Sequence, residues 1–202
     1  MKHYLYPNDY IDSVYDVDFE KLYNEGYRGV IFDTDNTLVP HNAPADERSK
    51  AFFRELSNLG FHTLLLSNNK EPRVKSFKEA AGVEFYIYKA NKPSVKGYED
   101  AMKIMGTDRE TTIFVGDQIF TDILGANRSG IRTIMVKPIL KWKEEIQIIF
   151  KRLLEAVVLL GYAIYKSFGG EVKKVPLKEN EKRLPHKTRV RKEDKHEDCN
   201  RK

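Results

Sequence analysis

The chain has 202 residues, of which 41% are hydrophobic, which is enough for one domain with a buried core but too little for two full domains. Five scattered histidines and a single cysteine, Cys199, exclude a zinc cluster and a disulfide framework, so we expect a reducing, cytoplasmic compartment. Pro7 and polar residues stand where a leader would have an apolar run, and no signal peptide is predicted.

The formal charge of +5 is concentrated at the C-terminus. Residues 171–202 contain 12 Lys or Arg against 7 Asp or Glu, whereas the two signs balance in the rest of the chain. A basic tail of this kind suits contact with nucleic acid, an anionic membrane or a ribosome, and it is also typical of a solvated, disordered end. The sequence leaves both interpretations open.

Apolar, β-forming runs alternate with helical patterns along the chain. The expected strands are residues 28–32, 61–66, 83–88, 111–115 and 131–136. The helices expected between them have apolar residues three and four apart and end on glycine. They are residues 45–60, 71–82, 94–106 and 118–130. This alternation predicts an α/β fold: a doubly wound, Rossmann-like parallel sheet of five strands, with ligands at the carboxyl ends of the strands.

Polar residues gather where four of these strands end. They are Asp33, Asp35 and Thr37 after the first strand, Ser67 and Asn68 after the second, Lys92 after the third, and Asp117 and Asp122 after the fourth. Each of them alone has an ordinary explanation as a turn residue, a helix cap or a surface charge. Their joint occurrence at one predicted edge, in this order, favours a functional site.

These groups suit phosphoryl transfer through an aspartyl-phosphate. A carboxylate attacks phosphorus, and a cation must shield the two negative groups from each other. Mg²⁺ prefers oxygen ligands, and lysine and serine can hold phosphate oxygens. Receiver domains of two-component signalling use related chemistry, but their lysine follows the fifth strand, whereas Lys92 precedes the second acidic site. The order favours a hydrolase.

The pattern D-x-D-x-T, Ser, Lys and G-D-x-x-x-x-D resembles the haloacid dehalogenase (HAD) superfamily of phosphatases, and the short connections resemble its capless class IIIA. Four stretches resemble the small bacterial YqeG family, which is similar to mitochondrial phosphatidylglycerophosphate phosphatases. They are residues 18–39, 65–77, 88–94 and 115–136. The resemblance spans roughly residues 4–140, and the C-terminal extension departs from it.

The resemblance implies a catalytic role for two aspartates and a metal site for four. Asp33 would be the nucleophile, and Asp35 the general acid that later activates water. Asp33 and Asp117 would bind Mg²⁺ together with the Asp35 carbonyl. Asp122 would support the metal shell or orient Lys92.

The resemblance also implies a substrate-binding set. Thr37 would brace the loop, Ser67 and Asn68 would hold the phosphate, and Lys92 would neutralise it. Further basic residues are expected near the site, and they are Lys70, Arg73 and Lys89. The substrate would be a phosphorylated lipid head group, with a soluble phosphate ester or a phosphorylated macromolecule as the alternative.

Three regions are expected: a phosphatase domain over 1–140, a helix within 141–170, and the basic tail over 171–202. Within the helical stretch 146–165, the uninterrupted apolar run is too short to cross a bilayer. The helix would lie in the interface of an anionic membrane, on the inner face, or pack on the body or a second subunit.

A non-enzymatic module that docks on RNA or the ribosome is the remaining alternative. The body has neither a basic face nor a stacking motif, so nucleic acid is a disfavoured partner. The sequence does not specify an oligomeric state.

Overall fold

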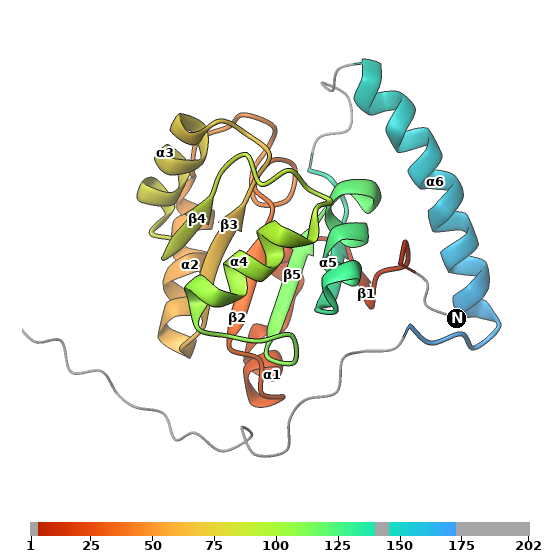
Figure 1. The fold of residues 1–202 in the computed structure, drawn as a ribbon, viewed down its shortest axis with the longest axis horizontal. Helices are drawn as coiled ribbons and strands as arrows, with labels where there is room; N and C mark the ends of the chain where they lie inside the picture. Colours follow the sequence, from red (N-terminus) through yellow and green to blue (C-terminus); the bar gives the residue numbers. More distant parts are fainter. Residues whose placement is uncertain (1–3, 140–145, 173–202) are drawn as a thin grey trace, which may run out of the picture.

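A computed structural model describes residues 4–139 and 146–172, with side chains for 4–139 and 153–172. Its centre is a sheet in which every pair of neighbouring strands is parallel. The strands are β1 (Asp9–Ile11), β2 (Gly29–Phe32), β3 (His62–Leu66), β4 (Phe85–Ile87), β5 (Thr112–Gly116) and β6 (Arg132–Val136). Their order across the sheet is β1-β6-β5-β2-β3-β4, which confirms the doubly wound α/β class (Figure 1).

The sheet has six strands, so the expectation of five was wrong. The additional strand is β1, which pairs with β6 so that Asp9 lies opposite Ile134. Its three residues include an aspartate and are too short to show a strand pattern. Its place is held by tertiary contacts, because Arg132 of β6 forms ion pairs at 2.9 Å with both Asp9 and Glu25.

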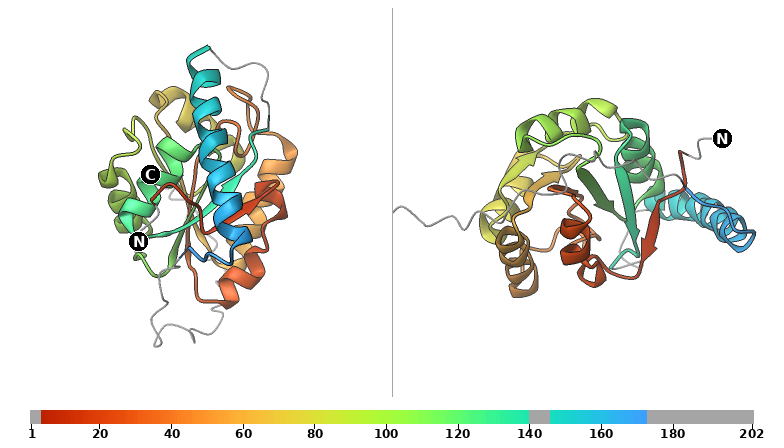
Figure 2. Two further views of the ribbon diagram at one scale, coloured as in Figure 1. Left: turned by 90° about the vertical axis from the view of Figure 1, so that its right-hand side faces the viewer. Right: turned by 90° about the horizontal axis from the view of Figure 1, so that it is seen from below.

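Helices cover both faces of the sheet, as Figure 2 shows from below. The bounds on one face are α1 (Phe19–Asn24), α2 (Glu47–Leu59) and α3 (Glu71–Ala81), and those on the other are α4 (Val95–Met105) and α5 (Leu124–Ser129). The helices α2 to α5 end at glycines with a left-handed backbone, as predicted. The expected helix 118–130 is interrupted, because a π-helical turn, Ile119–Ile123, precedes α5.

The core has two layers because side chains of a strand alternate between faces. Phe32 of β2 packs edge-on against Phe52 and Phe53 of α2 on one face. Its neighbour Ile31 belongs to the buried cluster on the other face, with Tyr98 of α4. The carboxyl ends of the strands, and the residues that follow them, lie at one common edge of the sheet, beyond both core layers.

The C-terminal helix α6 (Ile146–Ser167) lies beyond the edge strand β1 (Figures 1 and 2). One side of it packs on the body: the Glu155 carboxylate is buried and accepts a hydrogen bond from the Ile119 N–H at 2.7 Å. The ring of Tyr162 contacts that of Tyr6, with centroids 5.5 Å apart. None of the helices among the described residues has the length and apolarity needed to cross a membrane. Most of the expected tail, residues 173–202, lies outside the described residues.

Candidate active site

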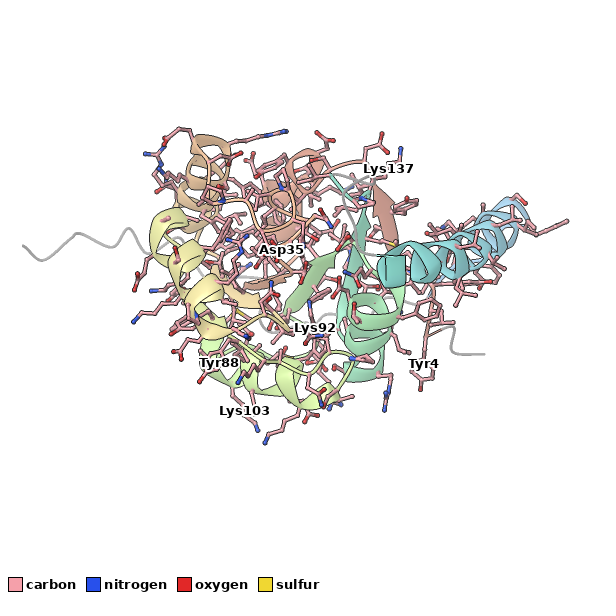
Figure 3. All side chains as sticks on the ribbon, turned by 90° about the horizontal axis from the view of Figure 1, so that it is seen from above. Tyr4, Asp35, Tyr88, Lys92, Lys103 and Lys137 are labelled. Atoms are coloured by element: carbon pink, nitrogen blue, oxygen red, sulfur yellow. The ribbon has the colours of Figure 1, made fainter. Side chains whose placement is uncertain are left out.

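The carboxyl ends of β2, β3 and β5 and the loop after β4 meet at one edge of the sheet. Figure 3 looks onto the molecule from above, with Asp35 and Lys92 labelled over the middle of the sheet. All eight predicted site residues come from these four strand ends, and seven of them are buried. The exposed one is Asn68. The structure therefore brings these residues to one edge of the sheet, and their chemical roles stay predictions.

Three buried carboxylates form an acidic cluster: Asp33 after β2, Asp117 after β5 and Asp122 in the π-helical turn. One oxygen of each lies within 4.8 Å of the others. Gly116 permits this approach, because a Cβ at that position would come within 2.6 Å of Asp122 Oδ2. Thr37 donates a hydrogen bond to Asp117 Oδ1 at 3.4 Å and so ties the loop after β2 to the cluster.

Lys92 connects the members of this cluster. Its Nζ lies 2.5 Å from Asp33 Oδ1 and 2.8 Å from Asp122 Oδ1, and its side chain is 3% exposed. Burial alone would lower the pKa of Lys92, but the charges of Asp122 and Asp33 raise it above its ordinary value. The lysine is therefore a fixed positive charge beside the carboxylates.

Burial shifts the pKa of Asp33 upward, opposite to its effect on Lys92, because it disfavours the carboxylate form. Desolvation raises the pKa of Asp33 to about 7, although Lys92 acts in the other direction. Neighbouring negative charge from Asp122 adds to the increase. A bound cation would favour the ionised form that a nucleophile or a metal ligand requires.

Asp35 lies outside the acidic cluster and has different partners. Its Oδ1 accepts hydrogen bonds from the Asn42 N–H at 2.9 Å and from Arg73 Nη2 at 2.8 Å. Its Oδ2 accepts one from Asn69 Nδ2 at 2.5 Å. The carboxylate of Asp35 thus does not contribute to the cluster, and a metal-binding role for its backbone carbonyl stays a prediction.

The two residues after β3 have local partners. Ser67 is buried, and its Oγ accepts a hydrogen bond from the Asn69 N–H at 3.2 Å. Asn68 makes two hydrogen bonds to the backbone of Lys92: its Oδ1 accepts from the N–H at 2.7 Å, and its Nδ2 donates to the carbonyl at 3.3 Å. Asn68 therefore holds the loop that carries Lys92, and its predicted contact with phosphate stays a prediction.

The donor set fits Mg²⁺. It consists of carboxylate oxygens, which hard divalent cations prefer. In their ionised forms the three carboxylates of the acidic cluster carry three negative charges, and Lys92 supplies one positive charge beside them. This balance leaves two negative charges, which one divalent cation would neutralise. The residues that would hold it are Asp33, Asp117 and Asp122.

Reasoning from the sequence missed the roles of Asn69 and Tyr98 at this site. Asn69 lies two residues after Ser67, but nothing in its position indicated that it would bind Asp35. Tyr98, which reads as an ordinary apolar helix position, donates through its hydroxyl to the carbonyls of Thr121 and Asp122 at 3.0 and 3.1 Å. It therefore fixes the turn that carries Asp122.

The chain is similar in sequence to known phosphatases. A family model described as HAD-hydrolase-like matches residues 89–138. The chain is 39% identical over 140 residues to a probable phosphatase YqeG of Bacillus subtilis, across 69% of this chain and 81% of that protein. It is 28% identical to a chloroplastic/mitochondrial phosphatidylglycerophosphate phosphatase 1 of Arabidopsis thaliana, across 78% and 48% of the two chains. A chloroplastic phosphatidylglycerophosphate phosphatase 1 of Chlamydomonas reinhardtii is 30% identical, across 76% and 59%.

The raised pKa of Asp33 predicts a pH-dependent response to Mg²⁺. Below about pH 7 the metal must displace a proton from this carboxyl, so its apparent affinity falls by about tenfold per pH unit. We therefore expect Mg²⁺ to raise the melting temperature more at about pH 8 than at about pH 6. Without metal, the same shift lowers stability as the pH rises from about 4 to about 7, because the folded state keeps a proton that the unfolded state releases.

Thermal unfolding with and without Mg²⁺, at both pH values, measures these effects. Asp33→Asn should weaken the pH dependence of the metal effect, because the titrating carboxyl is gone. Asp100→Asn is the matched control, since Asp100 pairs with Lys103 on α4 and makes no contact with the acidic cluster. Equal metal-induced shifts at the two pH values in the wild-type protein would contradict the prediction.

Proposed function

Because the chain belongs to the YqeG family of HAD-type phosphatases and is a phosphoric monoester hydrolase, we propose that it works through an aspartyl-phosphate with Mg²⁺ and that its substrate is phosphatidylglycerophosphate. The observation that carries the proposed chemistry is the contrast between two neighbouring aspartates. Asp33 lies beside Lys92 among buried carboxylates, whereas Asp35 is held by hydrogen-bond donors outside that cluster. Different surroundings are typical of two carboxyl groups with different catalytic roles.

In the first step, an oxygen of Asp33 attacks phosphorus, the bond from phosphorus to the alcohol oxygen breaks, and Asp35 gives that oxygen a proton. Water then attacks the phosphorus of the aspartyl-phosphate and passes a proton to Asp35. The bond from phosphorus to the Asp33 oxygen breaks, so phosphate is released and the Asp33 carboxylate is restored. Lys92 stabilises the negative charge of Asp33 before the attack and after the carboxylate is restored. Bound Mg²⁺ would shield the nucleophile from the phosphate oxygens.

Two observations support a lipid head group as the substrate. The first is that two relatives bear the name phosphatidylglycerophosphate phosphatase. The second is that the segments joining β2 to β3 and β3 to β4 contain one helix each in the described chain, α2 and α3. With such short connections, the edge of the sheet that carries the candidate active site, called the active edge below, is open to a bulky substrate.

The exposed side of α6 supports a position on a membrane surface. Large apolar side chains follow one another there at helical spacing. They are Leu153, Leu154, Val157, Leu160 and Ile164 within the helix and Phe168 directly after it, between 47% and 87% exposed. The opposite side of the helix is fixed to the body through Glu155 and Tyr162, so this apolar stripe faces away from the body. An apolar stripe of this kind suits insertion at the boundary between head groups and acyl chains.

Charge supports an anionic bilayer as the proposed partner of the apolar stripe. The segment that follows the helix, residues 171–202, has 12 basic residues against 7 acidic ones. Basic residues beside an apolar stripe bind anionic lipid through combined insertion and electrostatic attraction. The chain also passes the active edge just before α6, where the Ile139 N–H donates to the Asn36 carbonyl at 3.0 Å. A docked helix would therefore keep the site near the lipid surface.

Of the alternatives that the sequence left open, one is set aside and two remain. A non-enzymatic module for RNA or the ribosome is set aside, because the chain belongs to a family of phosphatases. A soluble phosphate ester or a phosphorylated macromolecule stays open as the substrate. Parallel assays of lipid and soluble monoesters decide between them.

Replacing the proposed nucleophile tests the mechanism. Asp33→Asn should reduce Mg²⁺-dependent hydrolysis of p-nitrophenyl phosphate by about a thousandfold or more, because the amide is a poor nucleophile. Far-ultraviolet circular dichroism should show a folded variant, since Lys92 keeps its ion pair with Asp122. Asp100→Asn serves as the control with the same change of charge. Activity within about threefold of wild type in Asp33→Asn would remove Asp33 from the role of nucleophile.

The role of Asp35 predicts a dependence on the leaving group. Asp35→Asn should slow the hydrolysis of an alkyl phosphate more than that of an aryl phosphate, because the aryl oxide leaves without needing a proton. The difference should be about tenfold or more in kcat/KM, measured with glycerol phosphate and p-nitrophenyl phosphate. Equal losses on both esters would mean that Asp35 only maintains the loop.

The apolar stripe predicts binding to vesicles that contain phosphatidylglycerol. Leu160→Gln should weaken co-flotation with them by about tenfold, because one large side chain no longer inserts. Hydrolysis of the lipid substrate should fall with it, while that of p-nitrophenyl phosphate stays unchanged. The matched control is Ile104→Gln, an exposed apolar residue of α4 that is 46% exposed, against 63% for Leu160.

Salt and oligomeric state complete this test. Vesicle binding of the wild-type protein should weaken as salt rises, because screening reduces the contribution of the basic segment. The absence of vesicle binding at low salt would refute the membrane proposal. A dimer in solution that Leu160→Gln dissociates would instead identify a second copy as the partner of the stripe.

A further inference from the structure

Arg73 is the second cation of the active edge, and it touches the aspartate that faces the leaving group in the proposed reaction. It belongs to the first turn of α3, and its Nη2 lies 2.8 Å from Asp35 Oδ1. Its guanidinium carbon lies 5.5 Å from the centre of the Phe77 ring. The ion pair and the ring together hold the guanidinium beside Asp35.

The guanidinium of Arg73 has hydrogen-bonding capacity left over. Arginine has five N–H donors. Within the described part of the chain, the buried Nε has no hydrogen-bond acceptor. A buried donor without an acceptor is costly, so native sites that contain one commonly await a ligand or a water. The Nε atom is buried, but the side chain as a whole is 20% exposed, so an anion from solvent would reach its other donors.

The two cations of the site have separate tasks. Lys92 is engaged by Asp33 and Asp122, next to the phosphorus that is attacked. Arg73 contacts the carboxylate that gives its proton to the alcohol oxygen, so it lies toward the alcohol that is released. An arginine at this place suits a second anionic group on that alcohol, because its planar fork matches phosphate oxygens.

We infer that Arg73 is a specificity-determining residue that binds a second phosphoryl group carried by the alcohol portion of the substrate. One N–H keeps its bond to Asp35, and the donors other than the buried Nε bind the second group. This inference rests on the proposed function, because it takes Asp35 as the group that faces the leaving oxygen. A phosphodiester in a lipid head group and a second phosphate in a soluble ester share this chemistry.

The test compares substrates that differ in the second phosphoryl group. They are glycerol 3-phosphate, the deacylated head group glycerophosphoglycerol phosphate, and short-chain phosphatidylglycerophosphate. Arg73→Gln should lower kcat/KM for the two substrates with a phosphodiester by roughly 10- to 100-fold more than for glycerol 3-phosphate. The additional loss should appear in KM, whereas a displaced Asp35 would lower kcat on all three.

Inhibition by the product analogue gives a readout that needs no turnover of the analogue. Glycerophosphoglycerol carries the phosphodiester but no monoester, so it should inhibit the wild-type protein and inhibit Arg73→Gln about tenfold less. Arg73→Lys should restore part of the inhibition, because lysine keeps the charge without the planar fork. The control is Arg109→Gln, since Arg109 pairs with Glu99 at the opposite edge of the sheet.

The possible outcomes distinguish a failure of this inference from a failure of the proposed function on which it rests. If the wild-type protein hydrolyses none of the esters with Mg²⁺, the proposed function fails. If it hydrolyses them and Arg73→Gln loses the same factor on all three with unchanged inhibition, the inference about Arg73 is overturned and the phosphatase stands. A selective loss on the acylated substrate alone also overturns it, because Arg73 would then respond to the lipid surface. Selective losses on both phosphodiesters support it.

Discussion

The buried ion pairs of Lys92 are the constraint on which the rest of the site depends. Its Nζ joins a carboxylate at the end of β2 to one in the π-helical turn after β5, while its own backbone is held by Asn68 after β3. A buried charge without its partner is strongly unfavourable, and so is a partly completed pair. Three strand ends must therefore reach their places together before any of these charges is stabilised. The same contacts that prepare the chemistry thus specify how the central strands are arranged.

The two aspartates after β2 diverge because the strand ends before them. Two residues one apart on a regular strand would face the same side of the sheet. Here β2 ends at Phe32, and the chain turns so that the Leu38 N–H donates to the Thr34 carbonyl at 3.0 Å. Asn36 takes a φ of 63° within this turn, a conformation that asparagine tolerates better than most residues. The turn sends Asp33 toward Lys92 and Asp35 toward Asn69, so neighbours in sequence have separate chemical surroundings.

Sequence periodicity predicted the parts of the fold that depend on local pattern. Buried runs such as residues 111–115 and helices that end on glycine were recognisable because burial and the left-handed cap each select particular residue types. The strand β1 was not recognisable from the sequence, because its three residues are held in place by pairing with β6 and by Arg132. At the site, the strand-end residues could be identified because a parallel sheet brings them together. The contact between Arg73 and Asp35 could not, because it depends on how α3 is placed on the sheet.

The structure shows how the helix α6 contacts the body of the protein, which the sequence left open. The stretch was expected either to lie on a membrane or to pack on the body, and the structure shows that one side of it packs on the body through Glu155 and Tyr162. The other side remains apolar and exposed. A helix with two apolar sides looks uniformly hydrophobic in sequence, so only the tertiary structure distinguishes the side that belongs to the core.

The contacts between α6 and the first residues of the chain also bear on how the protein folds. Tyr6 packs against Tyr162, and the side chain of Asn8 donates to the Val172 carbonyl at 3.4 Å, so the two ends of the described chain meet at one edge. Contacts between residues so far apart in sequence close a very long loop, and the entropy of that closure must be overcome before they contribute. We therefore expect the central strands to form first and this terminal pair to dock last. By the same reasoning it should open first, and its amide hydrogens should exchange faster than those of β2 and β5.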